Sequence, residues 1–261
     1  MTELDLGGRR MGFRYVGGPT ALLEMGGVRL LTDPTFDPPG EHPVGSRVLV
    51  KTAGPAVPPQ RLGPVDAVLL SHDQHPDNLD TLGRAYLELV PIVLSTASAR
   101  RRLGGRTVVA LANWTHLELP RRDGGVLRVT GVPARHGPQG SEPIVGEVTG
   151  FVLAGEHLPT VYVSGDNASL EVVGAVAERL GPVEVAVLFA GAARTALVPG
   201  ADLTLSSEAA AEAARILGAR AVVPLHFEGW AHFTQGRATL LAAFQRAGVA
   251  DRLHLPQPAD R

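Results

Sequence analysis

Cysteine is absent from this chain of 261 residues, which excludes disulfide bonds, thiolate metal ligands and a cysteine nucleophile. Long hydrophobic runs are also missing, because no uninterrupted apolar stretch reaches the roughly 18 residues that a membrane helix needs. Residues 1–10 lack the apolar core of a signal peptide. We therefore expect a cytoplasmic protein without a membrane partner.

The chain also lacks a strong charge of one sign, because its formal net charge is −2. No overall field therefore favours binding to nucleic acid. Apolar residues make up 44% of the chain, which is typical of a globular protein and can support a substantial core. We expect a single domain over residues 1–261, and the sequence leaves open whether copies of it form a homo-oligomer.

The most informative stretch is 67–80, in which a short apolar run ends in a cluster of polar side chains. The run itself, 67–70, is typical of a buried strand. Two histidines, two aspartates, a glutamine and an asparagine then follow within residues 72–78. Apolar side chains cannot satisfy such a cluster, so it is expected to face an open site. Imidazole and carboxylate groups suit zinc, manganese or iron.

Three further apolar runs end in the same way. Residues 129–136 end in His136, residues 161–166 end in Asp166, and residues 221–226 end in His226. A single histidine at a strand end is more often structural than functional. Four such runs together favour one metal centre on which the strand ends converge.

Short β-branched runs alternate with helical patterns, which predicts a mixed α/β fold. The helix at 207–217 is the clearest, because Ser206 suits its N-cap and Gly218 its C-terminus. Segment 36–64 is expected to be a long loop, either functional or a plain surface connector, and 137–146 to be irregular. The expected strands are 28–33, 67–71, 92–95, 107–111, 126–132, 151–153, 160–164, 183–189 and 221–225, and the expected helices are 79–89, 168–180, 207–217 and 237–247.

The order of these motifs resembles the metallo-β-lactamase-fold hydrolases, and most closely the branch that contains L-ascorbate-6-phosphate lactonase. Residues 20–34 resemble the opening hairpin of that branch, 133–136 its third motif, 164–166 its bridging-aspartate motif and 224–226 its final histidine. The resemblance implies a four-layer α/β/β/α sandwich of two mixed β-sheets flanked by helices, with the metals at one edge. These motifs are much less specific for the substrate, since one fold hosts many activities.

The main motif departs from the family pattern H-x-H-x-D-H. Residues 71–72 and 79–80 match the family on either side of the motif, but the stretch between them is one residue longer than in the family pattern. Either His75 or Gln74 then takes the second ligand position, and we prefer His75 because imidazole binds such metals far better than a carboxamide. Asn78 stands where the family has its last histidine. It either offers a carbonyl oxygen to the metal or caps the helix that follows, and the cap is the preferred interpretation.

By this resemblance, six residues would hold one or two metal ions, Zn²⁺ or else Mn²⁺ or Fe. The second site is expected to be weaker, reshaped or empty, because Asn78 does not supply an imidazole. The implied ligands are His72, His75 and His136 for the first ion, Asp77 and His226 for the second, and Asp166 as the bridge between them.

The implied function is a hydrolase in which metal-activated water attacks a small-molecule lactone, amide or phosphodiester. The alternative is a protein on the same fold that binds a metal or a metabolite without turnover. Asp77 is a catalytic candidate, and so are Glu228 and His232, which either assist proton transfer in the substrate cleft or brace His226. Further candidates are Asp33, Asp73 and Asp80 to orient ligand imidazoles, and Arg135 to bind an anion or pair with a carboxylate.

Overall fold

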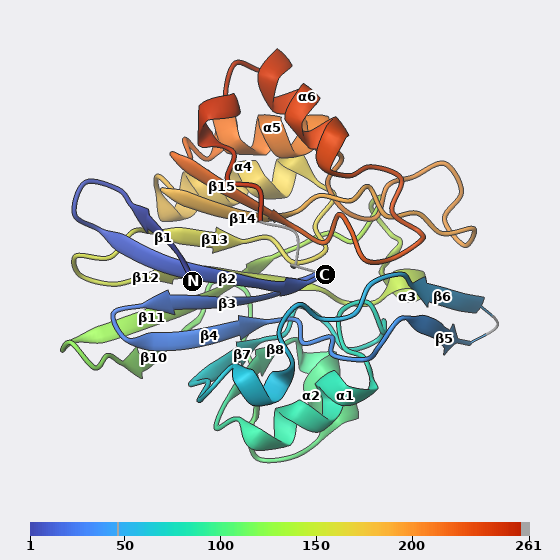
Figure 1. Cartoon of the computed structure of the whole chain (residues 1–261), viewed down its shortest axis with the longest axis horizontal. Helices are drawn as coiled ribbons and strands as arrows, with labels where there is room; N and C mark the ends of the chain where they lie inside the picture. Colours follow the sequence, from blue (N-terminus) through green and yellow to red (C-terminus); the bar gives the residue numbers. More distant parts are fainter. Residues whose placement is uncertain (46, 257–261) are drawn as a thin grey trace.

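Two mixed β-sheets lie at the centre of the computed structural model, which describes residues 1–45 and 47–256 (Figure 1). The first sheet has the spatial order β1 (Thr2–Asp5), β2 (Arg10–Gly17), β3 (Thr20–Met25), β4 (Val28–Thr32), β7 (Ala67–Leu69), β8 (Val93–Ser95) and β9 (Val108–Ala110). The second has the order β10 (His116–Pro120), β11 (Val126–Pro133), β12 (Thr149–Ala154), β13 (Val161–Val163), β14 (Val185–Phe189) and β15 (Ala221–Leu225). Strand pairing is parallel from β4 to β9 in the first sheet and from β13 to β15 in the second.

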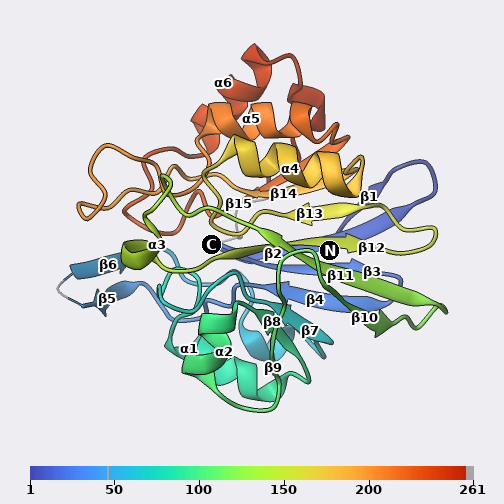
Figure 2. The ribbon, with the colours of Figure 1, turned by 180° about the vertical axis from the view of Figure 1, so that it is seen from behind.

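Helices cover the outer face of each sheet, so the molecule has four layers (Figures 1 and 2). The first sheet carries α1 (Thr81–Tyr86) and α2 (Ala97–Leu103), and the second carries α4 (Leu170–Leu180), α5 (Ser207–Ile216) and α6 (Arg237–Arg246). The α/β/β/α sandwich expected from the sequence is confirmed. None of the helices in the described part of the chain is long and apolar enough to cross a membrane.

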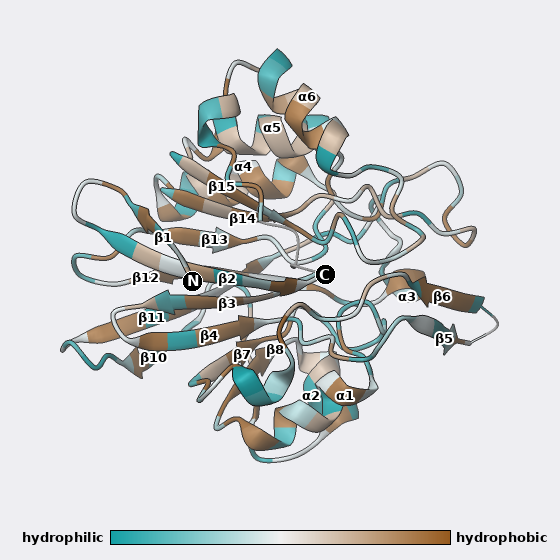
Figure 3. Cartoon of the chain, viewed as in Figure 1, coloured by the Kyte–Doolittle hydropathy of each residue, from teal (hydrophilic) through white to brown (hydrophobic). Residues whose placement is uncertain are grey.

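Hydrophobic side chains fill the spaces between these layers. One buried cluster joins the two sheets and includes Leu23 and Leu127. A second includes Val173 of α4 and Phe244 of α6, and lies between the helices and the second sheet. Figure 3 shows hydrophobic residues along many of the strands, whereas the outer helices carry both hydrophobic and hydrophilic residues. Burial of this apolar surface is the main force that holds the layers together.

Local sequence signals explain where the helices begin. The hydroxyl of Ser206 accepts a hydrogen bond from the Ala209 amide at 3.1 Å, as expected for the N-cap of α5. Helix α1 begins two residues later than expected, because Asp80 is its N-cap and accepts from the Gly83 amide at 2.8 Å. The interpretation of Asn78 as a helix cap is therefore wrong.

Both segments expected to be irregular contain regular elements. Segment 36–64 holds a separate two-stranded sheet, β5 (Gly40–Val44) and β6 (Arg47–Lys51), together with a 3₁₀ turn at Pro59–Arg61. Segment 137–146 holds the short helix α3 (Glu142–Val145). Figure 1 shows the β5–β6 hairpin and α3 at the same end of the sandwich. Strands β1, β2 and β10 and helix α2 also lie outside the elements that the sequence predicted.

Candidate metal centre

The six expected ligands converge because their strands end at one edge of the sandwich. In the parallel parts of the two sheets, β7, β13 and β15 run towards this edge, and each is followed there by a polar turn. The ligand atoms fall into two groups, within each of which they lie no more than 4.8 Å apart. The first group is His72, His75 and His136, and the second is Asp77, Asp166 and His226. His75, and not Gln74, belongs to the cluster.

Three buried imidazoles make up the first group. The Nε2 atom of His72 lies 3.0 Å from Nδ1 of His75, and the ring of His136 is 5.3 and 5.4 Å from theirs. Burial lowers the pKa of His72 well below its ordinary value and that of His75 to about 4. Both rings are therefore neutral at pH 7 and keep a nitrogen lone pair, which is the form that binds a metal.

Hydrogen bonds fix which nitrogen of each ring faces the centre. His136 donates from Nδ1 to the Leu203 carbonyl at 2.8 Å. Its Nε2 is buried and has no hydrogen-bond partner among the described residues. The Ser71 hydroxyl donates to Asp33 at 2.6 Å and so can accept from Nδ1 of His72 at 3.0 Å. The rings of His136 and His72 are thus held in the tautomer that leaves Nε2 available, the arrangement usual for metal ligands, whereas His75 faces His72 through Nδ1.

The second group places one imidazole between two carboxylates. His226 lies with Nδ1 2.9 Å from Oδ1 of Asp166 and with Nε2 3.2 Å from Oδ2 of Asp77. Burial opposes a charge on this ring, but the two carboxylates outweigh it and raise the pKa of His226 to about 10. Burial likewise opposes ionisation of Asp77, yet the rings of His232 and His226 hold its pKa well below the usual range. Such a group attracts a cation.

Only one of the three aspartates expected to orient an imidazole is linked to one, and the link runs through the Ser71 hydroxyl, which contacts His72. Asp33, directly after β4, accepts from the amide and the hydroxyl of Ser71, both at 2.6 Å. Burial raises the pKa of Asp33 to about 7. Asp73 instead pairs with Arg102, and Asp80 pairs with Lys51 at 2.9 Å.

Asn78 is fully buried beside the second group. Its Nδ2 donates to Asp33 at 3.1 Å and to Asp166 at 3.2 Å. The opposite orientation of the amide would place its carbonyl oxygen against two carboxylates, so the hydrogen-bond network fixes this one. Asn78 therefore turns its donor, and not its oxygen, towards Asp166.

The loop after β15 brings one of its two candidates to the centre. The Nε2 atom of His232 lies 3.0 Å from Oδ2 of Asp77, and its side chain is 16% exposed. Glu228 faces Arg237 at 3.6 Å and is not among the residues that line the recess over the cluster. The structure therefore does not support the expectation that Glu228 lines the cleft. Arg135 pairs with Glu171 at 2.9 Å, which is the carboxylate alternative.

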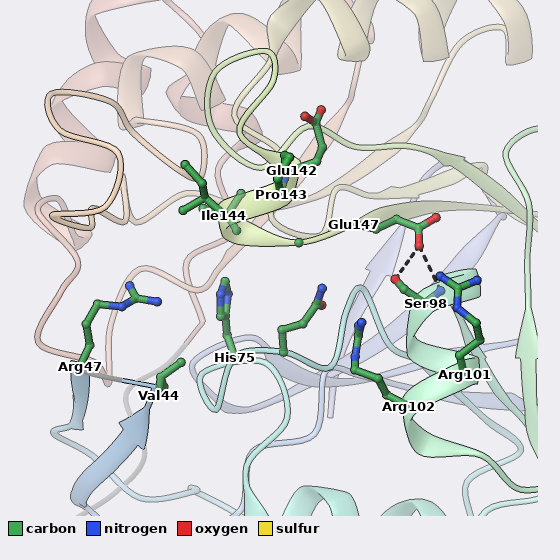
Figure 4. A pocket seen from close by; sticks show the side chains of 13 residues that line it. Val44, Arg47, His75, Ser98, Arg101, Arg102, Glu142, Pro143, Ile144 and Glu147 are labelled. Atoms are coloured by element: carbon green, nitrogen blue, oxygen red, sulfur yellow. Dashed lines mark hydrogen bonds between the residues drawn. The ribbon is translucent and has the colours of Figure 1, made fainter.

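A cavity of about 570 Å³ opens beside His75 (Figure 4). Arg47 and His75 line both this cavity and the smaller recess over the cluster. Figure 4 shows Ile144 of α3 on the opposite side of the cavity from Arg47 and His75. Sequence reasoning missed Arg47, although the short apolar run at 48–50 was a signal for a strand that it begins.

Comparison with known proteins gives consistent matches. Residues 28–227 match a family model described as a Beta-lactamase superfamily domain. A metal-dependent hydrolase from Rubrobacter xylanophilus is 28% identical over 281 aligned positions, covering 100% of this chain and 98% of that one. An isothiocyanate hydrolase from Delia radicum gut bacteria has a TM-score of 0.76 at 23% identity, covering 94% and 96%. A possible metal-dependent hydrolase from Veillonella parvula has a TM-score of 0.77 at 15% identity, covering 95% and 97%.

Proposed function

Because this chain belongs to the β-lactamase superfamily, we propose that it is a metal-dependent hydrolase of a small-molecule substrate. One observation carries the proposal: imidazoles and carboxylates from distant parts of the sequence meet at one edge of the sandwich in two groups, and the ligand atoms of each group lie within 4.8 Å of one another. The unpartnered Nε2 of His136 and the neutral rings of His72 and His75 fit a divalent cation.

The residues divide into two ligand sets. His72, His75 and His136 would hold the first ion, and Asp77 and His226 the second. Asp166 lies 2.9 Å from His226 and 3.7 Å from His136, so its carboxylate is placed between the two sets. Bound zinc, manganese or iron supplies a nucleophilic water near neutral pH and polarises the oxygen under attack.

The cavity limits the substrate to a small molecule. Its volume of about 570 Å³ lies within the usual range for small-ligand sites, roughly 300–1,000 Å³. Arg47 stands where the cavity meets the recess over the cluster, and no carboxylate among the described residues pairs with it. We therefore propose a substrate whose reacting carbonyl or phosphoryl group lies near an anionic group. Lactones, amides and phosphodiesters remain the candidate classes, and the isothiocyanate hydrolase with this fold adds a fourth.

The test combines metal analysis with a substrate panel. The purified protein is expected to carry at least one equivalent of metal and to hydrolyse at least one member of a panel of lactones, amides, phosphodiesters and isothiocyanates. Asp166→Ala should lose metal and activity while circular dichroism shows the fold intact. Asp123→Ala, which removes an exposed aspartate paired with Arg121, should change neither. A chain that binds no metal after metal-replete expression would contradict the proposal, and bound metal without turnover would favour the binding protein instead.

A further inference from the structure

Two imidazole nitrogens converge on one carboxylate oxygen at the second group. Oδ2 of Asp77 lies 3.2 Å from Nε2 of His226 and 3.0 Å from Nε2 of His232. Metal–ligand bonds of about 2.0–2.2 Å place neighbouring ligand atoms roughly 3.0–3.5 Å apart. Each of the two nitrogens is therefore spaced from this oxygen as two ligand atoms of one metal ion are.

The imidazole of His226 lies between two buried carboxylates. Its Nδ1 lies 2.9 Å from Oδ1 of Asp166, and its Nε2 lies 3.2 Å from Oδ2 of Asp77. Buried carboxylates with imidazole nitrogens against them are a donor set that suits a divalent cation.

Asn78 brings no imidazole nitrogen to this shell. Its amide group donates to Asp33 and Asp166, and this orientation directs the carbonyl oxygen away from both carboxylates. The main motifs then provide three members of the second set: Asp77, Asp166 and His226. A further neutral nitrogen ligand would complete a tetrahedral site.

The backbone around His232 holds this side chain in place from two sides. On one side, the Ala231 amide donates to the Val50 carbonyl of β6 at 2.9 Å. On the other, the Arg194 amide donates to the carbonyl of His232 itself at 3.3 Å. The ring also packs against Phe233, with centroids 4.6 Å apart. A ligand needs such fixed placement, because loss of position weakens metal binding.

We infer that His232 is a ligand of the second metal ion and supplies the nitrogen that position 78 does not. The inference rests on the proposed function, since it concerns the metal that the second group would hold. It also replaces two expectations from the sequence. His232 binds metal instead of transferring a proton or bracing His226, and the second site keeps a full set of ligands despite Asn78.

Metal titration of the stripped protein tests the inference. The unaltered chain is expected to bind two equivalents of Zn²⁺ by calorimetry, and His232→Ala should keep one and bind the other at least about 100-fold more weakly. His42→Ala is the matched control, because His42 also packs against Trp230, with ring centroids 5.2 Å apart, and faces Asp37 instead of the cluster. The control should bind both equivalents as the unaltered chain does.

A second variant separates ligation from a simple hydrogen bond to Asp77. His232→Gln keeps a side-chain N–H that can donate to Asp77 but loses the imidazole, so the second equivalent should still be lost. His232→Asp, which offers a carboxylate ligand, should retain more of it than His232→Gln does. The absorption of the Co²⁺-loaded protein should show the loss of one site in His232→Gln, without reference to activity.

The outcomes distinguish the inference from the function on which it rests. Two equivalents of unchanged affinity in His232→Gln would overturn the inference and leave the hydrolase proposal standing. A single equivalent in the unaltered chain that His232→Gln does not affect would do the same. No binding of metal by the unaltered chain would overturn both. If His232→Ala does not fold, the comparison of His232→Gln with His42→Ala carries the test.

Discussion

Lys51 and Asp80 form a buried ion pair between the end of β6 and the start of α1. Their charged atoms lie 2.9 Å apart, and the two side chains are 4% and 0% exposed. Oδ1 of Asp80 also accepts from the amides of Gly83 and Phe36, at 2.8 and 2.9 Å, and Oδ2 from that of Asp37 at 2.7 Å. This pair therefore joins the hairpin, the segment after β4 and the helix that follows the main motif.

The expected energies follow from this burial. Removing one partner of a buried ion pair costs about 3–5 kcal/mol, because the other charge is left without compensation. Asp80 would keep three backbone donors after Lys51→Met, so we expect the lower end, about 3 kcal/mol. Asp80→Asn should cost a similar amount, because one side of its amide group would face the ammonium of Lys51. The double variant removes both charges, and its cost should fall short of the sum by about 2–3 kcal/mol.

Urea unfolding of the four proteins measures this coupling. The free energies of unfolding can be compared if the four proteins have similar m-values, because the m-value reports the surface that unfolding exposes. The exposed pair Arg128–Glu118, at 3.1 Å, gives a control cycle that should yield less than about 1 kcal/mol. A coupling of less than about 0.5 kcal/mol for Lys51 and Asp80 would refute the reasoning. Because the ammonium of Lys51 also lies 5.5 Å from the centre of the Trp230 ring, in the loop that carries His232, Lys51→Met should also weaken the binding of the second metal.

Three further predictions concern single positions. A Cβ at Gly83 would lie 1.8 Å from the carbonyl oxygen of Pro34, so Gly83→Ala should lower the melting temperature, by an amount that corresponds to about 1–3 kcal/mol. For Asp33, burial raises the pKa from 3.8 to about 7, so between these pH values the folded state binds more protons than the unfolded state. The free energy of unfolding, measured in chelator, should therefore fall as pH rises through this window, and Asp33→Asn should flatten that part of the profile. Arg47→Met should raise KM for an anionic substrate about tenfold or more while the metal content stays constant, and equal KM values would exclude a role for Arg47 in binding.

The convergence of the proposed ligands could be predicted from the sequence because each motif that carries them follows an apolar run. A buried strand that ends in His72, Asp166 or His226 fixes both the position and the direction of that side chain through the sheet. The role of Asn78 could not be predicted in this way, since its partners Asp33 and Asp166 lie 45 and 88 positions away. The nearby Asp80 accepts the bond that an N-cap would, and local sequence does not show which of the two residues caps α1.

The hairpin β5–β6 and helix α3 were expected to be irregular, yet they complete the surroundings of the metal centre. The hairpin makes a sheet of its own, and its Val48 and Val50 are exposed, so apolar burial does not fix it as it fixes the central strands. It is held instead by a few polar contacts, among them those of Lys51 with Asp80 and of Val50 with Ala231. Substitutions in this hairpin that keep these contacts can reshape the cavity at little cost to the two sheets. The sandwich therefore sets the position of the proposed metal ligands, and we expect the hairpin and α3, which line the cavity, to influence which substrate reaches them.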